Sequence, residues 1–268
     1  MNPSYEHLQI ERKEHVLWIW LNRPEASNAY SLSMVEDLPR ALRAANRDPQ
    51  VRVVVLAARG KNFCAGGDLK AMRDRSGMFA GGPNELRERY MDGIQQIPRA
   101  IRELRRPLVA MVQGAAVGAG CDLAAMADLR IASTEASFAE TFANVGLVPG
   151  DGGAWFLIRA VGHAKATEMF FTAKSYSSSE AQLMGLVHEV VSAEQLEKRV
   201  SELSAQLASK PPIALQLTKQ ALHHAYESSV ETHLELAANL QAIAQRSVDH
   251  QAAVEGLLSK TERPYRFE

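Results

Sequence analysis

Two glycine-rich segments constrain the fold of this chain more than any other feature of its sequence: Asn62–Lys70 (NFCAGGDLK) and Gln113–Asp122 (QGAAVGAGCD). Each segment follows a predicted strand and leads towards a predicted helix with few bulky side chains. Glycine leaves backbone N–H groups open to a ligand, and the first N–H groups of a helix have no partner within it. If both junctions face one cavity, two N–H donors converge there.

A pair of converging N–H groups is suited to stabilising a negatively charged oxygen. Asp122 ends the second segment and supplies an acid next to that position. The combination predicts an enzyme that stabilises an enolate. The alternative is that the glycines serve only close packing of strands on helices.

Composition excludes several classes of partner. With 268 residues the chain can bury a large core, which favours one large domain or one domain with a small appendage. A net charge of −1 argues against nucleic acid as a partner, and no apolar run is long enough to span a membrane. The two cysteines, Cys64 and Cys121, are expected to be buried thiols. We therefore expect a soluble, cytoplasmic protein.

The first part of the chain alternates short strands and helices. His15–Leu21 is a predicted strand, and Ser33–Glu36 forms a capping-box pattern for a helix towards Arg47. Pro39 is expected to kink this helix or delay its start. Further buried strands are predicted at Val51–Ala58, Leu108–Val112 and Asp128–Ser133. The polar stretch Arg73–Asn84 predicts a loop or lid.

From about residue 192 only helical periodicity remains. The predicted helices are Ala193–Ser209, Pro212–Tyr226, Val230–Arg246 and Val248–Ser259. We therefore expect an α/β core over residues 1–195, followed by a helical region over residues 196–268. The apolar faces of these helices exceed what a tail can bury against its own core, which indicates an interface between subunits.

The ordered set of motifs resembles the crotonase superfamily of enoyl-CoA hydratases and isomerases over nearly the whole chain. The resemblance rests on Leu21–Pro24 (LNRP), the two glycine-rich segments, Val145–Gly153 (VGLVPGDGG) and Ser179–Leu186 (SEAQLMGL). It implies a spiral of ββα turns that binds an acyl-CoA thioester and a C-terminal region that forms a homotrimer or a dimer of trimers. It implies no cofactor, since coenzyme A is part of the substrate. The histidines show no metal-ligand spacing with other donors, so no metal is expected.

The resemblance also implies particular site residues. The N–H groups of Gly67 and Ala119 hold the thioester oxygen. Ala65 and Lys70 lie near the pantetheine and phosphate portions of coenzyme A, although Lys70 can equally be an ordinary solvated lysine. Phe142 and Trp155 are expected to shape the acyl pocket.

The expected acids depart from the family pattern. Hydratases of this family use two glutamates, and this chain has Asp122 at the first position and Phe142, which cannot transfer a proton, at the second. Glu140 and Asp151 are candidate replacements. Asp122 can instead be a structural acid, Glu140 a surface or interface carboxylate, and Asp151 an N-cap of the helix that follows it.

The leading hypothesis is therefore hydration or double-bond isomerisation of an enoyl-CoA through an oxyanion-stabilised enolate. The altered acids favour isomerisation slightly, because it needs only one shuttling base. Two alternatives stay open: an acyl-CoA hydrolase or retro-Claisen C–C bond hydrolase of the same fold, and a non-catalytic acyl-CoA binder.

Overall fold

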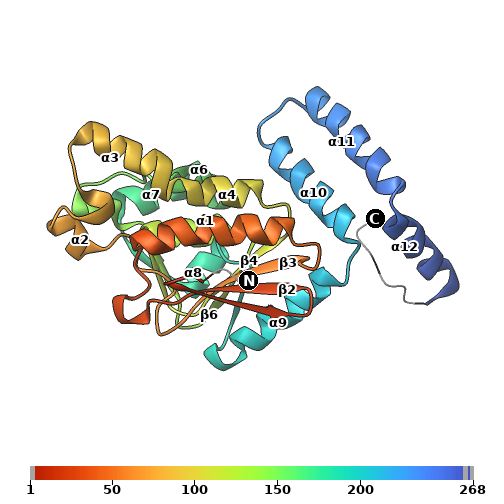
Figure 1. The fold of residues 1–268 in the computed structure, drawn as a ribbon, viewed down its shortest axis with the longest axis horizontal. Helices are drawn as coiled ribbons and strands as arrows, with labels where there is room; N and C mark the ends of the chain where they lie inside the picture. Colours follow the sequence, from red (N-terminus) through yellow and green to blue (C-terminus); the bar gives the residue numbers. More distant parts are fainter. Residues whose placement is uncertain (1–3, 262–264, 266–268) are drawn as a thin grey trace.

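The structure is a computed structural model that describes residues 4–261 and Tyr265, so the outer ends of the regions expected at 1–195 and 196–268 lie outside the described residues. A six-stranded sheet with the order β1-β2-β3-β4-β6-β9 forms the centre of the molecule (Figure 1). Its strands are β1 (Leu8–Lys13), β2 (Val16–Leu21), β3 (Val53–Ala58), β4 (Leu108–Val112), β6 (Leu129–Ser133) and β9 (Glu189–Val191). β1 and β2 are antiparallel, and every other neighbouring pair is parallel.

Both faces of the sheet are covered, which explains why β3 is apolar at every position. Val54 and Leu56 belong to a core cluster shared with α1 (Leu32–Arg47) and α4 (Gln96–Glu103). Val53 and Val55 belong to a second cluster, shared with α9 (Ala193–Ala208). Successive side chains of a strand point to opposite faces, so the uninterrupted apolar run serves two layers of helix (Figure 1).

A smaller sheet with the order β5-β7-β8 lies beside the first. Its strands are β5 (Ala115–Val117), β7 (Ser137–Ala139) and β8 (Ser175–Ser177). The chain therefore passes from β4 to β5 to α5 (Ala119–Ala125), and likewise from β6 to β7 and on to α6 (Gly153–Val161). Each turn gives one strand to each sheet and then a helix. The expected ββα spiral is present.

The remaining helices complete this core. They are α2 (Leu69–Arg73), α3 (Pro83–Arg89), α7 (His163–Thr172) and α8 (Ser178–Leu183), together with 3-10 turns at Pro24–Ala26, Gly77–Phe79 and Thr141–Val145 and a π-helical turn at Tyr90–Ile94. The stretch expected as a loop over Arg73–Asn84 contains only the short turn at Gly77–Phe79 before α3 begins.

Three helices, α10 (Pro212–Ala225), α11 (Val230–Gln245) and α12 (Val248–Ser259), lie to one side of the core (Figure 1). They agree with the helices predicted from periodicity to within one residue. α9 instead packs on the large sheet, so the part that extends away from the core begins at α10. A partly buried ion pair, in which Lys219 Nζ lies 2.6 Å from Asp128 Oδ2, links α10 to the core.

One local expectation is wrong, and another is wrong in one of its two alternatives. The N-cap of α1 is Ser31, whose hydroxyl accepts the Met34 N–H at 3.1 Å, whereas Ser33 lies inside the helix. The Tyr30 N–H is bound to Gly66 O at 2.8 Å, which holds the chain extended up to that cap. Pro39 does not delay the helix, because α1 begins seven residues before it. Within residues 4–261 and 265, no helix has the length and hydropathy required to cross a membrane.

Candidate active site

The two glycine-rich segments lie side by side. The Cys64 N–H donates to Ala115 O at 3.1 Å, and the Val117 N–H donates to Cys64 O at 2.9 Å. This pairing brings the residues that follow, Gly67 and Ala119, to the wall of one cavity of about 290 Å³. Both cysteines are buried free thiols.

The backbone N–H groups of Gly67 and Ala119 are the free donors of this wall. Within the described residues, neither N–H has a hydrogen-bond partner. Ala119 is the first residue of α5, where such a vacancy is expected. Gly67 is held by Asp68, which accepts the Lys70 and Ala71 N–H groups and also binds Arg23 at 3.0 Å.

Gly118 orients the start of α5. Its φ of +52° and ψ of −125° lie in a region that residues with a side chain rarely adopt. Its N–H donates to Ala139 O at 2.7 Å, at the end of β7. The Ala119 N–H is the next donor along the chain, so the strained glycine determines where that donor points.

Three carboxyl groups gather beside these amides. Asp122 comes from α5, Glu140 follows the end of β7, and Asp151 precedes α6. Their exposed fractions are 0%, 0% and 3%. Three acids from distant parts of the sequence are therefore removed from water together, which is costly unless they share protons or partners.

The carboxyl of Asp122 lies close enough to both Asp151 and Glu140 to interact with their charges. Both oxygens of Asp122 and of Glu140 lack a hydrogen-bond donor among the described residues. Neighbouring buried carboxyl groups oppose each other's ionisation, so the cluster retains protons that isolated carboxyl groups would lose.

Burial has the same effect on each acid. It raises the pKa of Asp122 well above its usual range, and the negative charges of Asp151 and Glu140 raise it further. Burial raises the pKa of Glu140 to about 8. It also raises the pKa of Asp151, although the neighbouring Asp122 carboxyl and the hydrogen bond from the Gly153 N–H oppose this. Acids that keep their protons near neutral pH are suited to proton transfer.

Asp151 differs from the other two acids in its position. It lines the cavity together with Gly67 and Ala119, whereas Asp122 and Glu140 lie behind it. Its Oδ1 accepts the Gly153 N–H at 3.3 Å at the start of α6, and its Oδ2 is buried without another donor among the described residues. The N-cap of α6 is Gly152, so the alternative of Asp151 as the N-cap is wrong. Asp151 precedes the N-cap, and one of its oxygens accepts the first N–H of the helix while the other has no donor among the described residues.

Two residues of the site were not among the predicted site residues. A Cβ added to Gly153 would lie 1.7 Å from both Cγ and Oδ1 of Asp122, so only glycine fits against the carboxyl cluster. Tyr90, in the π-helical turn, lines the same cavity as Asp151. The glycine pair Gly152–Gly153 was available in the sequence as a turn signal, but Tyr90 lies 61 residues from Asp151 along the chain.

The expected binding residues separate into two groups. Ala65 and Phe142 line the cavity. Trp155 lies outside it, with its ring 3.6 Å from the Arg159 guanidinium and 4.9 Å from that of Arg102. Its predicted contact with the acyl group is therefore corrected: in α6 it faces α4 and belongs to a cation–π stack. Lys70 is exposed on α2 outside the cavity wall, so its contact with coenzyme A stays a prediction.

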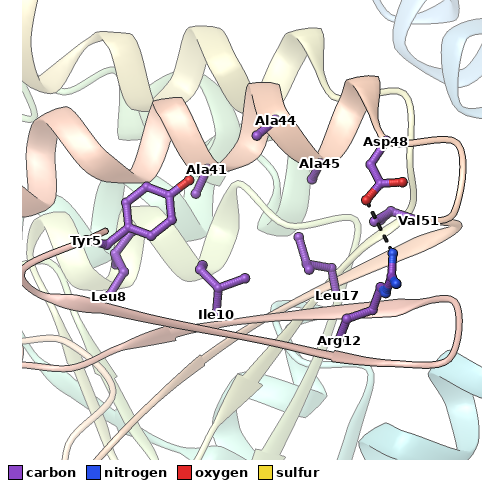
Figure 2. A pocket seen from close by; sticks show the side chains of 10 residues that line it. All are labelled: Tyr5, Leu8, Ile10, Arg12, Leu17, Ala41, Ala44, Ala45, Asp48 and Val51. Atoms are coloured by element: carbon purple, nitrogen blue, oxygen red, sulfur yellow. Dashed lines mark hydrogen bonds and ion pairs between the residues drawn. The ribbon is translucent and has the colours of Figure 1, made fainter. Parts of the chain in front are cut away.

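A separate groove of about 580 Å³ lies between α1 and the strands β1 and β2 (Figure 2). Its lining is mostly apolar, and an ion pair between Arg12 and Asp48 at 3.5 Å lies at one end. It contains none of the predicted site residues. No group of metal-ligating side chains of the required size occurs within the described part of the chain.

Comparison with known proteins places these observations in a family. The family model described as "Enoyl-CoA hydratase/isomerase" matches residues 11–268. The crotonyl-CoA hydratase of Syntrophomonas wolfei is 31% identical over 96% of both chains. The 1,2-epoxyphenylacetyl-CoA isomerase of Escherichia coli is 33% identical over 91% of this chain and 92% of its own.

The solved structures agree. The crystal structure of an enoyl-CoA hydratase from Bacillus anthracis superposes with a TM-score of 0.92 at 29% identity, covering 98% of this chain and all of the other. The crotonase-like α/β fold expected from the motifs is thereby confirmed. The chain belongs to the enoyl-CoA hydratase/isomerase family and is an enzyme of that class, with acyl-CoA thioesters as its substrates.

Proposed function

We propose that this enzyme stabilises the enolate of an enoyl-CoA between the backbone N–H groups of Gly67 and Ala119. The observation that carries the proposal is that these two unpaired donors line one cavity together with Asp151. Removing a proton from the carbon next to a thioester places negative charge on the thioester oxygen. One well-placed donor at such an oxygen contributes about 2.7–4 kcal/mol.

Asp151 is the group that exchanges the proton with the substrate. In an isomerisation its carboxylate takes a proton from C2 of a 3-enoyl thioester, the charge passes to the thioester oxygen, and the same proton returns at C4. The double bond moves from C3–C4 to C2–C3, and no water is consumed. Phe142 at the second family position cannot supply another acid, so this one-base reaction is favoured over hydration.

Asp122 and Glu140 act behind Asp151. Burial raises the pKa of Asp151, and the neighbouring Asp122 carboxyl opposes this rise, which keeps part of the Asp151 population ionised and able to accept a proton. Glu140 interacts with the Asp122 carboxyl as well, and its charge raises the pKa of Asp122. In this scheme Asp122 is a positioning residue and Glu140 supports it. Backbone amides and carboxyl groups are sufficient for the reaction, so no cofactor beyond the coenzyme A of the substrate is required.

The protein is further proposed to assemble as a homotrimer or a dimer of trimers. The helices α10, α11 and α12 carry exposed apolar side chains, among them Leu222, Leu234, Ile243, Leu257 and Leu258. Apolar surface on this scale is typical of an interface between subunits, and closed cyclic symmetry is the usual arrangement. A cytoplasmic location is proposed on the free thiols, which are typical of a reducing compartment.

Solvent deuterium exchange tests the proposed reaction. The enzyme is incubated in D₂O with 2-enoyl- and 3-enoyl-CoA substrates, and the thioesters are analysed by mass spectrometry and NMR. Interconversion of the two double-bond positions supports isomerisation, and formation of 3-hydroxyacyl-CoA supports hydration. Release of free coenzyme A would favour a hydrolase, and binding without conversion or exchange would leave only an acyl-CoA binder.

A substitution at Gly67 tests whether the reaction depends on the proposed N–H donors. Gly67→Val places a branched side chain in the cavity wall and should abolish conversion. Gly82→Val is the matched control, because Gly82 is exposed, has a φ of −82°, and a Cβ there would meet only Glu85 Oε2 at 3.9 Å. Equal activity in the two variants would contradict the role of the Gly67 amide.

A further inference from the structure

Tyr90 occupies an unusual place in the backbone. It begins a π-helical turn between α3 and α4, in which the Gln95 N–H donates to Tyr90 O at 3.0 Å. Single π-helical turns are rare and occur frequently at functional sites. The extra residue in the turn changes the direction in which the Tyr90 side chain leaves the helix.

The Tyr90 ring is fixed against the loop that carries Asp151. A Cβ added to Gly150 would lie 2.9 Å from Cε1 of Tyr90, so the ring packs directly on the Gly150 backbone. Gln95, at the C-terminal end of the π-helical turn, donates from Nε2 to Gly150 O at 2.8 Å. The loop that carries Asp151 therefore contacts both ends of the turn. The ring is therefore held next to the residue that precedes Asp151.

Tyr90 and Ile94 form a partition. Both line the cavity that contains Gly67, Ala119 and Asp151, and both also line a second cavity of about 210 Å³. Apolar side chains, among them Leu32, Val35 and Met78, dominate the wall of this second cavity, although Glu36, Arg89 and Asp92 also border it. Two cavities that share only these two side chains are separated by them.

We propose that Tyr90, supported by Ile94, is the residue that limits the length of the acyl group this enzyme accepts. The inference rests on the proposed function, which places the reacting carbons beside Asp151. The acyl chain continues past those carbons towards Tyr90 and stops at its ring. The natural substrate therefore has a compact acyl group, and the second cavity stays empty when it binds.

Binding of saturated acyl-CoA thioesters tests this inference without requiring turnover. Isothermal titration calorimetry measures the Kd for a series of straight chains from butanoyl- to hexadecanoyl-CoA. Each buried methylene strengthens binding by about four-fold at most. In the wild type the gain is expected to stop at a short chain length. In Tyr90→Ala it is expected to continue over further methylenes as the chain enters the second cavity.

Three further variants test whether the Tyr90 ring itself limits the length of the bound acyl chain. Tyr90→Phe keeps the ring and should keep the wild-type cut-off, because the Tyr90 hydroxyl has no hydrogen-bond partner within the described residues. Tyr90→Ala combined with Leu32→Trp refills the second cavity and should restore the cut-off. Ile94→Ala leaves the contact between Tyr90 and Gly150 intact and should lengthen the accepted chain less than Tyr90→Ala does.

The outcomes are distinct. A folded Tyr90→Ala with the wild-type length profile would overturn the inference, as would an equal shift in Tyr90→Phe. If Tyr90→Ala does not fold, an unchanged profile in Ile94→Ala overturns it instead. A wild-type protein that binds no acyl-CoA would overturn the proposed function as well, whereas an unchanged profile with normal turnover would overturn only the role of Tyr90.

Discussion

The carboxyl of Asp122 lies beside that of Asp151, and of this pair only Asp151 lines the cavity. The sequence made Asp122 the stronger candidate, because the helix around it is otherwise apolar and was expected to remove it partly from water and raise its pKa. In the structure the Asp122 side chain does not line the cavity and lies next to Gly153 and Glu140. The two acids therefore have separable functions, one towards the substrate and one towards its neighbour.

The first prediction concerns this pair. Asp151→Asn should lower kcat by about 10²- to 10⁴-fold, the usual contribution of a positioned acid or base. The fold should persist, because an amide oxygen can still accept the Gly153 N–H. Asp122→Asn should cost less, because an amide N–H can still donate to Asp151. Steady-state kinetics measures both, and a larger loss in Asp122→Asn than in Asp151→Asn would show that Asp122 transfers the proton itself.

The second prediction concerns the pH dependence of stability. The pKa of Glu140 is raised from 4.5 to about 8 in the folded protein, mainly by burial. The folded state therefore binds this proton more tightly than the unfolded chain does, and the free energy of unfolding falls as the pH rises from about 4.5 to about 8. Each unit of that window contributes at most about 1.4 kcal/mol.

Glu140→Gln removes this titration. Urea unfolding should show the variant gaining stability relative to the wild type between pH 5 and pH 8, with little difference at the acidic end. The same substitution at Glu25, whose side chain is 70% exposed, provides the control and should leave the pH profile unchanged. Parallel profiles for the wild type and Glu140→Gln would contradict a shared proton at Glu140.

The third prediction concerns Gly153. A methyl group there would lie 1.7 Å from the Asp122 carboxyl, which is enclosed by Asp151 and Glu140 and has no room to move. Gly153→Ala should therefore destabilise the protein by about 1–3 kcal/mol, as overpacking does, and should also lower activity. Thermal unfolding and kinetics measure the two effects.

Combining Gly153→Ala with Asp122→Ala removes the group with which the methyl collides. The double variant should be more stable than the sum of the two single changes predicts, since residues in contact are not additive. Strict additivity would mean that the methyl group is accommodated elsewhere.

Much of this fold follows from local sequence. The uninterrupted apolar run of β3 indicates a strand covered on both faces, and the limits of α12 follow from periodicity and its flanking serine. The position of Tyr90 could not be inferred in this way, because a π-helical turn has no simple sequence signature and its contact with Gly150 depends on packing between distant segments. Trp155 was misplaced for a related reason: its position in α6 turns it towards Arg159 and away from the cavity.

The fourth prediction concerns assembly. Leu257 and Leu258 of α12 are 82% and 77% exposed in the single chain. Analytical ultracentrifugation should give the mass of a trimer or a hexamer, and Leu257→Glu combined with Leu258→Glu should give smaller species. Leu183→Glu alters an equally exposed leucine on α8 and should keep at least the trimer. A wild-type protein that stays monomeric at micromolar concentrations would contradict the proposal.

The fifth prediction concerns the oxyanion site, and a crystal structure with a bound, non-reacting acyl-CoA tests it most directly. The quantities to measure are the distances from the thioester oxygen to the backbone nitrogens of Gly67 and Ala119. Both should be about 2.7–3.1 Å, the range of effective oxyanion donors, with an Asp151 oxygen facing C2 of the acyl group. A thioester oxygen bound by neither amide, or turned away from the side on which Asp151 lies, would contradict the enolate mechanism.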